Sequence, residues 1–271
     1  MKKNIILMAV ALAGLVACEQ SVPYEKGAQM DPEGPNVYFS NYNPAQMVLA
    51  SDATEFEIAV LRDDATNALT VPLKGVCTVD GIFEVPESVE FASGVDSVGV
   101  KVTVTDKIEM FKNYSITLSV PEEYTHQYAL QEEYPACAVK VVKEDYVTYA
   151  EGILYDTFYF ESAFAYNLEY SELLDNYRIK NPWASGGDDF VFTWDGTEKV
   201  TMSAQKYATG FTIGNYGAVT ANIVSAVYTH FAAGELMQTE CDAFYININW
   251  SVSAGSFGEY PEIFIVQNVV K

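Results

Sequence analysis

Two aromatic side chains lie in segments whose Pro and Gly residues interrupt strand patterns. Trp183 stands in the run Asn-Pro-Trp-Ala-Ser-Gly-Gly and Tyr216 in Gly-Asn-Tyr-Gly, so both are predicted to lie on loops. A flat ring on a loop can stack on the apolar face of a sugar ring, while neighbouring Asp188 and Asn215 can hydrogen-bond its hydroxyl groups. These four residues are therefore candidate ligand-binding residues. The alternative interpretation, in which the rings fold back over one end of a β-sandwich, stays open.

Sequence motifs of catalysis and metal binding are absent. The chain has no GxSxG, HExxH, Walker or GxGxxG pattern. Its two histidines, His126 and His230, are far apart and no CxxC pair accompanies them, so a zinc site is not expected. The neighbouring acids Asp188 and Asp189 follow two glycines and are interpreted as part of a solvated loop. We predict a non-enzymatic protein without cofactor or metal.

The N-terminus has the pattern of an export signal. Lys2 and Lys3 precede an apolar run of 13 residues, Ile5 to Ala17. A transmembrane helix needs about 20 apolar residues, whereas the core of a signal peptide needs roughly 7–15. Residues 1–17 are therefore predicted to be a signal peptide.

The sequence Leu-Val-Ala-Cys at 15–18 resembles the lipobox of bacterial lipoproteins. The resemblance implies cleavage before Cys18, acylation of its thiol and anchoring of the mature chain in lipid. In enteric relatives, an Asp directly after the acylated cysteine favours retention in the inner membrane. This chain has Glu19 at that position, so the outer membrane is the expected location. Residues 18–35 are rich in Pro and Gly and poor in apolar side chains, so they are predicted to form a flexible tether that reaches at most about 60 Å.

Charge and composition exclude some classes of partner. The chain has 15 basic and 37 acidic residues, which give a formal net charge of −22, and 49% of its residues are hydrophobic. The apolar fraction is that of a folded protein. The negative charge repels phosphate backbones, so we expect no nucleic-acid partner.

Three cysteines remain after the predicted cleavage: Cys77, Cys137 and Cys241. An odd number leaves at least one thiol unpaired in a monomer. Strand alternation places Cys77 and Cys137 on apolar faces, so two buried thiols or a disulfide between them are both compatible with the pattern.

The rest of the chain shows strand periodicity and no sustained helical period, which predicts an all-β fold. The strands expected in the first half are 56–61, 71–79, 88–91, 98–104, 114–120 and 136–142. Those expected in the second half are 153–160, 164–170, 176–180, 190–194, 200–204, 211–213, 218–227, 243–250 and 262–269. A polar stretch at 143–151 separates the halves, so we predict two immunoglobulin-like β-sandwich domains, 36–144 and 145–271. Strand parity places Trp194 and Trp250 in the second core.

The segments Val79–Pro86, Val89–Gly94 and Val98–Asp106 resemble the middle of a Calx-beta-type immunoglobulin-like sandwich, and the resemblance covers about residues 36–144. In the calcium-binding members of that family, paired acids follow the Val-rich strand. Here Lys107 and Ile108 separate Asp106 from Glu109, and a hard cation needs about six to eight oxygen ligands. The resemblance therefore implies the fold, and it leaves calcium binding open.

The predicted export signal with its lipobox, the two predicted β-domains and the loop aromatics together resemble accessory surface lipoproteins of glycan-uptake systems in Gram-negative gut anaerobes. The resemblance implies a non-catalytic lipoprotein at the outer membrane, with lipid, an oligosaccharide and an outer-membrane transporter complex as partners. A structural or adhesive subunit, as in fimbrillin-like lipoproteins, is the first alternative. A glycoside hydrolase is the second.

Overall fold

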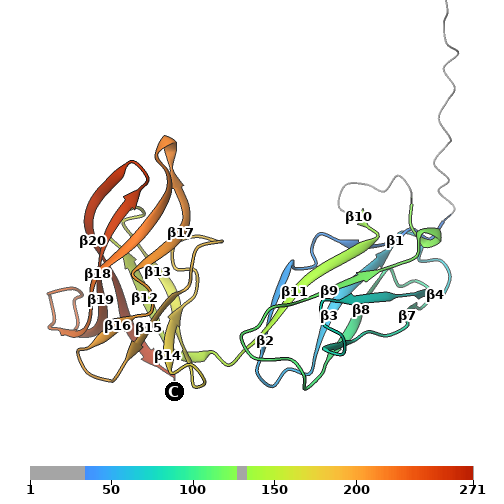
Figure 1. Ribbon diagram of the computed structural model, residues 1–271, viewed down its shortest axis with the longest axis horizontal. Helices are drawn as coiled ribbons and strands as arrows, with labels where there is room; N and C mark the ends of the chain where they lie inside the picture. Colours follow the sequence, from blue (N-terminus) through green and yellow to red (C-terminus); the bar gives the residue numbers. More distant parts are fainter. Residues whose placement is uncertain (1–33, 127–132, 271) are drawn as a thin grey trace, which may run out of the picture.

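The computed structural model describes residues 34–126 and 133–270, in two domains joined by a short link between β11 and β12 (Figure 1). The predicted signal peptide, the predicted lipidation site Cys18 and most of the predicted tether lie outside these residues. The regular structure within them consists of β-strands and two short 3₁₀ turns, η1 (Glu122–Tyr124) and η2 (Gly214–Tyr216). The prediction of an all-β protein is confirmed. No helix in the described part of the chain is long and apolar enough to cross a membrane.

The N-terminal domain packs two sheets face to face. One sheet has the order β10 (Glu133–Tyr134), β1 (Val37–Ser40), β3 (Glu55–Arg62), β8 (Ser97–Val104), β6 (Phe83–Glu84), and the other has β2 (Gln46–Ala50), β11 (Ala136–Glu144), β9 (Tyr114–Ser119), β5 (Lys74–Cys77). A separate pair joins β4 (Leu69–Pro72) to β7 (Ser88–Phe91). Alternate side chains fill the core, as Phe56, Ile58 and Val60 of β3 show.

The expected strand 71–79 is in fact two strands in different sheets. β4 ends at Pro72, which has no backbone N–H to continue a ladder, and β5 then pairs with β9. The sequence also gave no sign of β1 and β2. In β2 the apolar residues Met47, Val48 and Leu49 are consecutive, so the sequence shows no alternation of apolar and polar side chains.

Cys77 and Cys137 are both free thiols, half-buried against the N-terminal core. Burial raises the pKa of each thiol, which lowers the fraction of reactive thiolate. Of the two arrangements that the sequence left open, the structure shows packed thiols.

The C-terminal domain is one antiparallel sheet of nine strands that curls around its own core. The strand order is β16 (Val200–Met202), β15 (Phe190–Trp194), β14 (Asn176–Ile179), β13 (Ser162–Ser171), β12 (Val147–Asp156), β20 (Gly255–Val269), β19 (Cys241–Val252), β18 (Gly217–Phe231), β17 (Lys206–Ile213). An isolated bridge between Lys199 and Val227 connects the β15–β16 turn to β18. The curl thereby brings the two sides of the sheet together, and the core lies inside it.

Aromatic rings dominate this second core. Phe190, Phe192, Phe244, Phe264 and Trp250 are each fully buried. Trp250 thus lies where strand parity predicts, whereas Trp194 is half-buried and packs on the rim, against rings that include Phe244. Gly152 makes room for this packing, because a Cβ atom there would overlap the Phe264 ring and the backbone of β20.

The link between the domains is short. β11 continues to Glu144 and β12 begins at Val147, so the polar stretch 143–151 is mostly strand. Only Asp145 and Tyr146 lie between the two strands. The Asp145 carboxylate accepts a hydrogen bond from the Ser171 hydroxyl of the second domain at 2.6 Å.

Candidate functional site

Exposed aromatic rings gather at one end of the C-terminal domain, away from the link. β12 starts at the link and runs ten residues to Asp156, about 30 Å, before the turn 157–161. That turn, the β17–β18 connection and the β19–β20 hairpin meet there (Figure 1). We call the side chains that they expose the aromatic surface, and its members are Tyr159, Phe160, Phe164, Phe211, Tyr216, Phe257 and Tyr260.

The rings of the aromatic surface touch one another and face solvent. Tyr159 stacks on Phe211 with a centroid distance of 4.7 Å and meets Phe160 edge-on at 4.9 Å. Their packing leaves large parts of the rings free. The exposed fractions are 58% for Tyr216, 45% for Tyr159, 40% for Phe164 and Tyr260, and 39% for Phe160.

A second layer of rings supports this surface from below. Phe158 stacks on Trp250 at 4.8 Å and also contacts Phe257 at 5.5 Å. Trp183 packs edge-on against Trp250 at 5.5 Å. The exposed rings therefore stand on the hydrophobic core and not on a mobile loop.

The structure separates the four predicted ligand-binding residues into two groups. Tyr216 and its neighbour Asn215 are exposed on η2, and Tyr216 meets Phe257, so both belong to the aromatic end. Trp183 is only 6% exposed, and its ring cannot stack on a ligand. The alternative interpretation, folding back over the end of the domain, describes Trp183 correctly.

Asp188 has a local structural contact. Its carboxylate accepts the backbone N–H of Ala208 at 2.6 Å, and its own N–H donates to the Ala208 carbonyl at 2.8 Å. These bonds fasten the Gly-rich loop to β17, at the end of that strand remote from Tyr216. Asp188 is therefore not grouped with the aromatic surface.

Sequence reasoning missed Tyr159 and Phe160 because it extended a strand through Phe160. In the structure β12 ends at Asp156, whose Oδ1 accepts the backbone N–H groups of Phe158, Tyr159 and Phe160 at 2.8–3.1 Å. A more distant N–H, of Glu161, lies at 3.4 Å. An Asp that precedes three consecutive aromatic residues without alternation is the available signal, because Asp favours turns of this kind.

The carboxylates near the aromatic surface are of two kinds. Glu161 and Glu259 are exposed, and Glu259 accepts a bond from the Asn247 amide. Glu262 is fully buried at 0% exposure, beside Asp156 at 2%. Burial raises the pKa of Glu262 well above its ordinary value, and the charge of Asp156 and a hydrogen bond to it raise it further. The Trp183 indole acts in the opposite direction.

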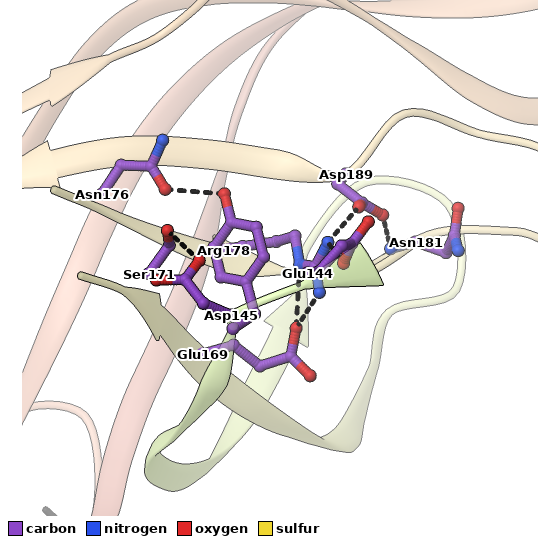
Figure 2. A network of polar contacts seen from close by, with 9 residues as sticks. Glu144, Asp145, Glu169, Ser171, Asn176, Arg178, Asn181 and Asp189 are labelled. Carbon is purple, nitrogen blue, oxygen red and sulfur yellow. Dashed lines mark hydrogen bonds and ion pairs between the residues drawn. The ribbon is translucent and has the colours of Figure 1, made fainter. Parts of the chain in front are cut away.

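A separate polar network lies at the link between the domains (Figure 2). Arg178 of β14, whose side chain is 6% exposed, contacts Glu144 at 2.7 Å, Glu169 at 2.6 Å and Asp189 at 3.3 Å. Burial alone would lower the pKa of the Arg178 guanidinium, but its bonds to Glu144 and Glu169 outweigh burial and raise the pKa. Since Glu144 ends β11, the network connects the last strand of the first domain to the second.

Tyr146 completes this network. The Arg178 guanidinium lies 3.7 Å from the centroid of the Tyr146 ring, and the Tyr146 hydroxyl donates to Asn176 at 2.6 Å. The ring also meets Phe111 of the first domain edge-on at 5.9 Å. The network is therefore a structural junction between the two domains.

No metal centre is apparent in the described parts of the chain. Within residues 34–126 and 133–270, no three His, Cys, Asp or Glu side chains are grouped as ligands. Asp106 and Glu109 are therefore not part of such a group, and the Glu109 carboxylate is paired with Lys112 at 2.6 Å.

Comparisons with known proteins concern the fold alone. No protein-family model matches the chain, and no curated protein sequence matches it significantly. The similar solved structures include Calx-beta domains and Bacteroides ovatus proteins. The apo-form Calx CBD1 domain is 19% identical, with a TM-score of 0.32, over 42% of this chain and 100% of that one.

Two Bacteroides ovatus structures extend over both domains. One, of unknown function, is 9% identical with a TM-score of 0.36, over 87% of this chain and 95% of that one. Another, a multidomain protein, is 10% identical with a TM-score of 0.32, over 88% and 92% respectively. None of these similarities assigns an activity.

Proposed function

We propose that the protein is a non-catalytic, lipid-anchored surface protein that binds neutral oligosaccharides through the aromatic surface. The observation that carries this proposal is the group of exposed rings that stands on a rigid core at the end of the C-terminal domain. Exposed apolar patches of this kind mark interaction sites on soluble domains.

The chemistry of the surface matches that of a sugar. Pyranose rings present flat C–H faces, which pack on aromatic rings, and hydroxyl groups, which need polar partners at the edge. Tyr159, Tyr216 and Tyr260 offer both a ring and a hydroxyl. The exposed Asn215 amide beside Tyr216 supplies a donor and an acceptor.

Charge restricts the class of glycan. The segments that form the aromatic end, 156–164, 211–217 and 250–262, contain no Lys or Arg. The exposed acids there are Glu161 and Glu259. An acidic polysaccharide or a sulfated glycan would be repelled, so a neutral oligosaccharide is the ligand class that we propose.

The proposed anchor is Cys18, and the proposed location is the outer membrane, beside a transporter complex that receives the captured oligosaccharide. In support of this location, the sequence has the complete order of basic start, apolar core and lipobox. The aromatic surface lies at the end of the C-terminal domain away from the link, and a position remote from the anchor leaves it free for a ligand.

Removal of a single ring is expected to weaken oligosaccharide binding. Tyr216→Ala and Tyr159→Ala should each raise Kd by about 2- to 10-fold, which corresponds to one aromatic contact. Isothermal titration with oligosaccharides selected on a glycan array measures the effect. Tyr42→Ala is the matched control, because Tyr42 is 88% exposed on the N-terminal domain. Equal affinities for wild type and both surface variants would contradict the assignment of the site.

The anchor has its own test. Cys18→Ala is expected to release the protein from the membrane fraction, because a chain without acyl groups loses about 0.8 kcal/mol per CH₂ that lipid would bury. Mass spectrometry of the wild-type N-terminus should show a processed, acylated cysteine. An unmodified thiol at that position would refute the anchor without affecting the binding test.

A further inference from the structure

The turn that carries Phe158, Tyr159 and Phe160 is held by one oxygen of a buried carboxylate. Asp156 Oδ1 accepts the backbone N–H groups of these residues at 2.8–3.1 Å. The other oxygen, Asp156 Oδ2, is buried, and no N–H or alcohol O–H group of the described residues donates to it. The position of the aromatic turn therefore depends on the core side chains that pack against the Asp156 carboxylate.

Glu262 is the core side chain next to Asp156. The two residues are paired neighbours on β12 and β20, and the Glu262 side chain is fully buried. Neither Glu262 oxygen accepts a hydrogen bond from the described residues. Paired residues on neighbouring strands place their side chains on the same face of a sheet, so the two buried carboxyl groups are in contact. Two ionised carboxylates have no hydrogen to share, so the contact requires a proton on one of them.

Apart from the Trp183 indole N–H, which has no other partner and offsets the raised pKa of Glu262 only in part, the surroundings of Glu262 offer no compensation for a negative charge. The Trp183 indole lies beside it, and the phenol of Tyr166 on β13 is the other titratable group that faces it. The Tyr166 hydroxyl donates instead to the Pro182 carbonyl at 2.9 Å. With both acids ionised and no cation among these groups, two like charges would face each other in the core, which is strongly unfavourable.

We propose that Glu262 is a positioning residue of the aromatic surface: protonated at neutral pH, its O–H donates to Asp156 Oδ2 and holds the turn 157–161 in its binding form. Loss of this proton at alkaline pH loosens the turn and weakens ligand binding. The link to binding rests on the proposed function above, whereas the proton itself does not.

The proton can be observed directly. Infrared spectroscopy of the wild-type protein at neutral pH should show the C=O band of a protonated carboxylic acid. Glu262→Gln should lack that band. Glu259→Gln, which changes an exposed acid three residues away on the same strand, should retain it. Absence of the band from the wild type at neutral pH would overturn the proposal, with no variant needed.

The pH dependence of stability follows from the raised pKa of Glu262. The folded state holds a proton that the unfolded state loses near pH 4.5, the ordinary value. The stabilisation that this proton provides is therefore fully present below that pH, and it decreases as pH rises toward the pKa of Glu262 in the folded state. Glu262 contributes up to a tenfold rise in the unfolding equilibrium constant per pH unit within this window.

Glu262→Gln is expected to remove that contribution, because a neutral amide can donate to Asp156 at every pH. Oligosaccharide affinity of the variant should remain close to the wild-type value at pH 7 and should no longer decline at alkaline pH. A variant with the wild-type pH slope would refute the positioning role. If the band and the slope are present but no sugar binds, the proposed function fails and the proton pair stands.

Discussion

Arg178→Met is expected to destabilise the protein by about 3–5 kcal/mol, the usual cost of removing one partner from a buried ion pair. The substitution leaves the carboxylates of Glu144, Glu169 and Asp189 facing one another, with side-chain exposures of 16%, 23% and 28%. Water can solvate them only in part, and their mutual repulsion is no longer offset. Urea unfolding followed by tryptophan fluorescence measures the loss.

Two variants show whether charge or geometry is responsible. Arg178→Lys keeps the charge but loses the planar fork that bonds several carboxylates and stacks on Tyr146, so an intermediate loss is expected. Lys180→Met removes an exposed cation two residues away and should change stability by less than about 0.5 kcal/mol. If Arg178→Met is as mild as Lys180→Met, the network of Figure 2 contributes little to stability.

Arg178 is also expected to restrict the movement of one domain relative to the other. Glu144 ends the last strand of the first domain, and Tyr146 packs between Arg178 and Phe111. With only two residues between β11 and β12, these contacts restrict the rotation of the link. Their loss should broaden the distribution of distances between labels placed on the two domains.

Strand periodicity predicted what depends on local pattern and missed what depends on distant contacts. β7 and β15 occupy the expected residues, because the residue types along these segments follow the alternation of more and less buried side chains in the strands. The partners of Arg178 come from three different segments of the chain. No spacing rule links residues 144, 169 and 189, so a cluster that forms only when strands pair could not be read from the sequence.

The candidate site shows the same division. The sequence predicts that Tyr216 lies on a loop because Gly residues flank it in a short segment, and the structure shows its ring exposed. Trp183 has similar neighbours, yet Trp250 and Phe190 provide a surface on which it packs. Whether a loop ring faces solvent or core depends on the rings beneath it, and those come from other strands.

Asp156→Ala is the second variant from which a large effect is expected. Four backbone N–H groups of the aromatic turn lose their shared acceptor, and Glu262 loses the partner of its proton. Bonds to a charged acceptor are stronger than neutral ones, so a loss of about 2–4 kcal/mol in stability is expected. Oligosaccharide affinity should fall by more than about tenfold, because Tyr159 and Phe160 lose their fixed positions.

A second aspartate provides the matched control. Asp195 Oδ1 accepts the N–H and the hydroxyl of Thr197 in the β15–β16 turn, outside the segments that form the aromatic end. Asp195→Ala should cost about 1 kcal/mol and leave affinity unchanged. Asp156→Asn, which keeps an oxygen to accept the turn N–H groups, should retain most of the binding. If Asp156→Ala and Asp195→Ala have equal effects on affinity, the aromatic surface is not organised by its turn, and ligand recognition must be sought elsewhere on the domain.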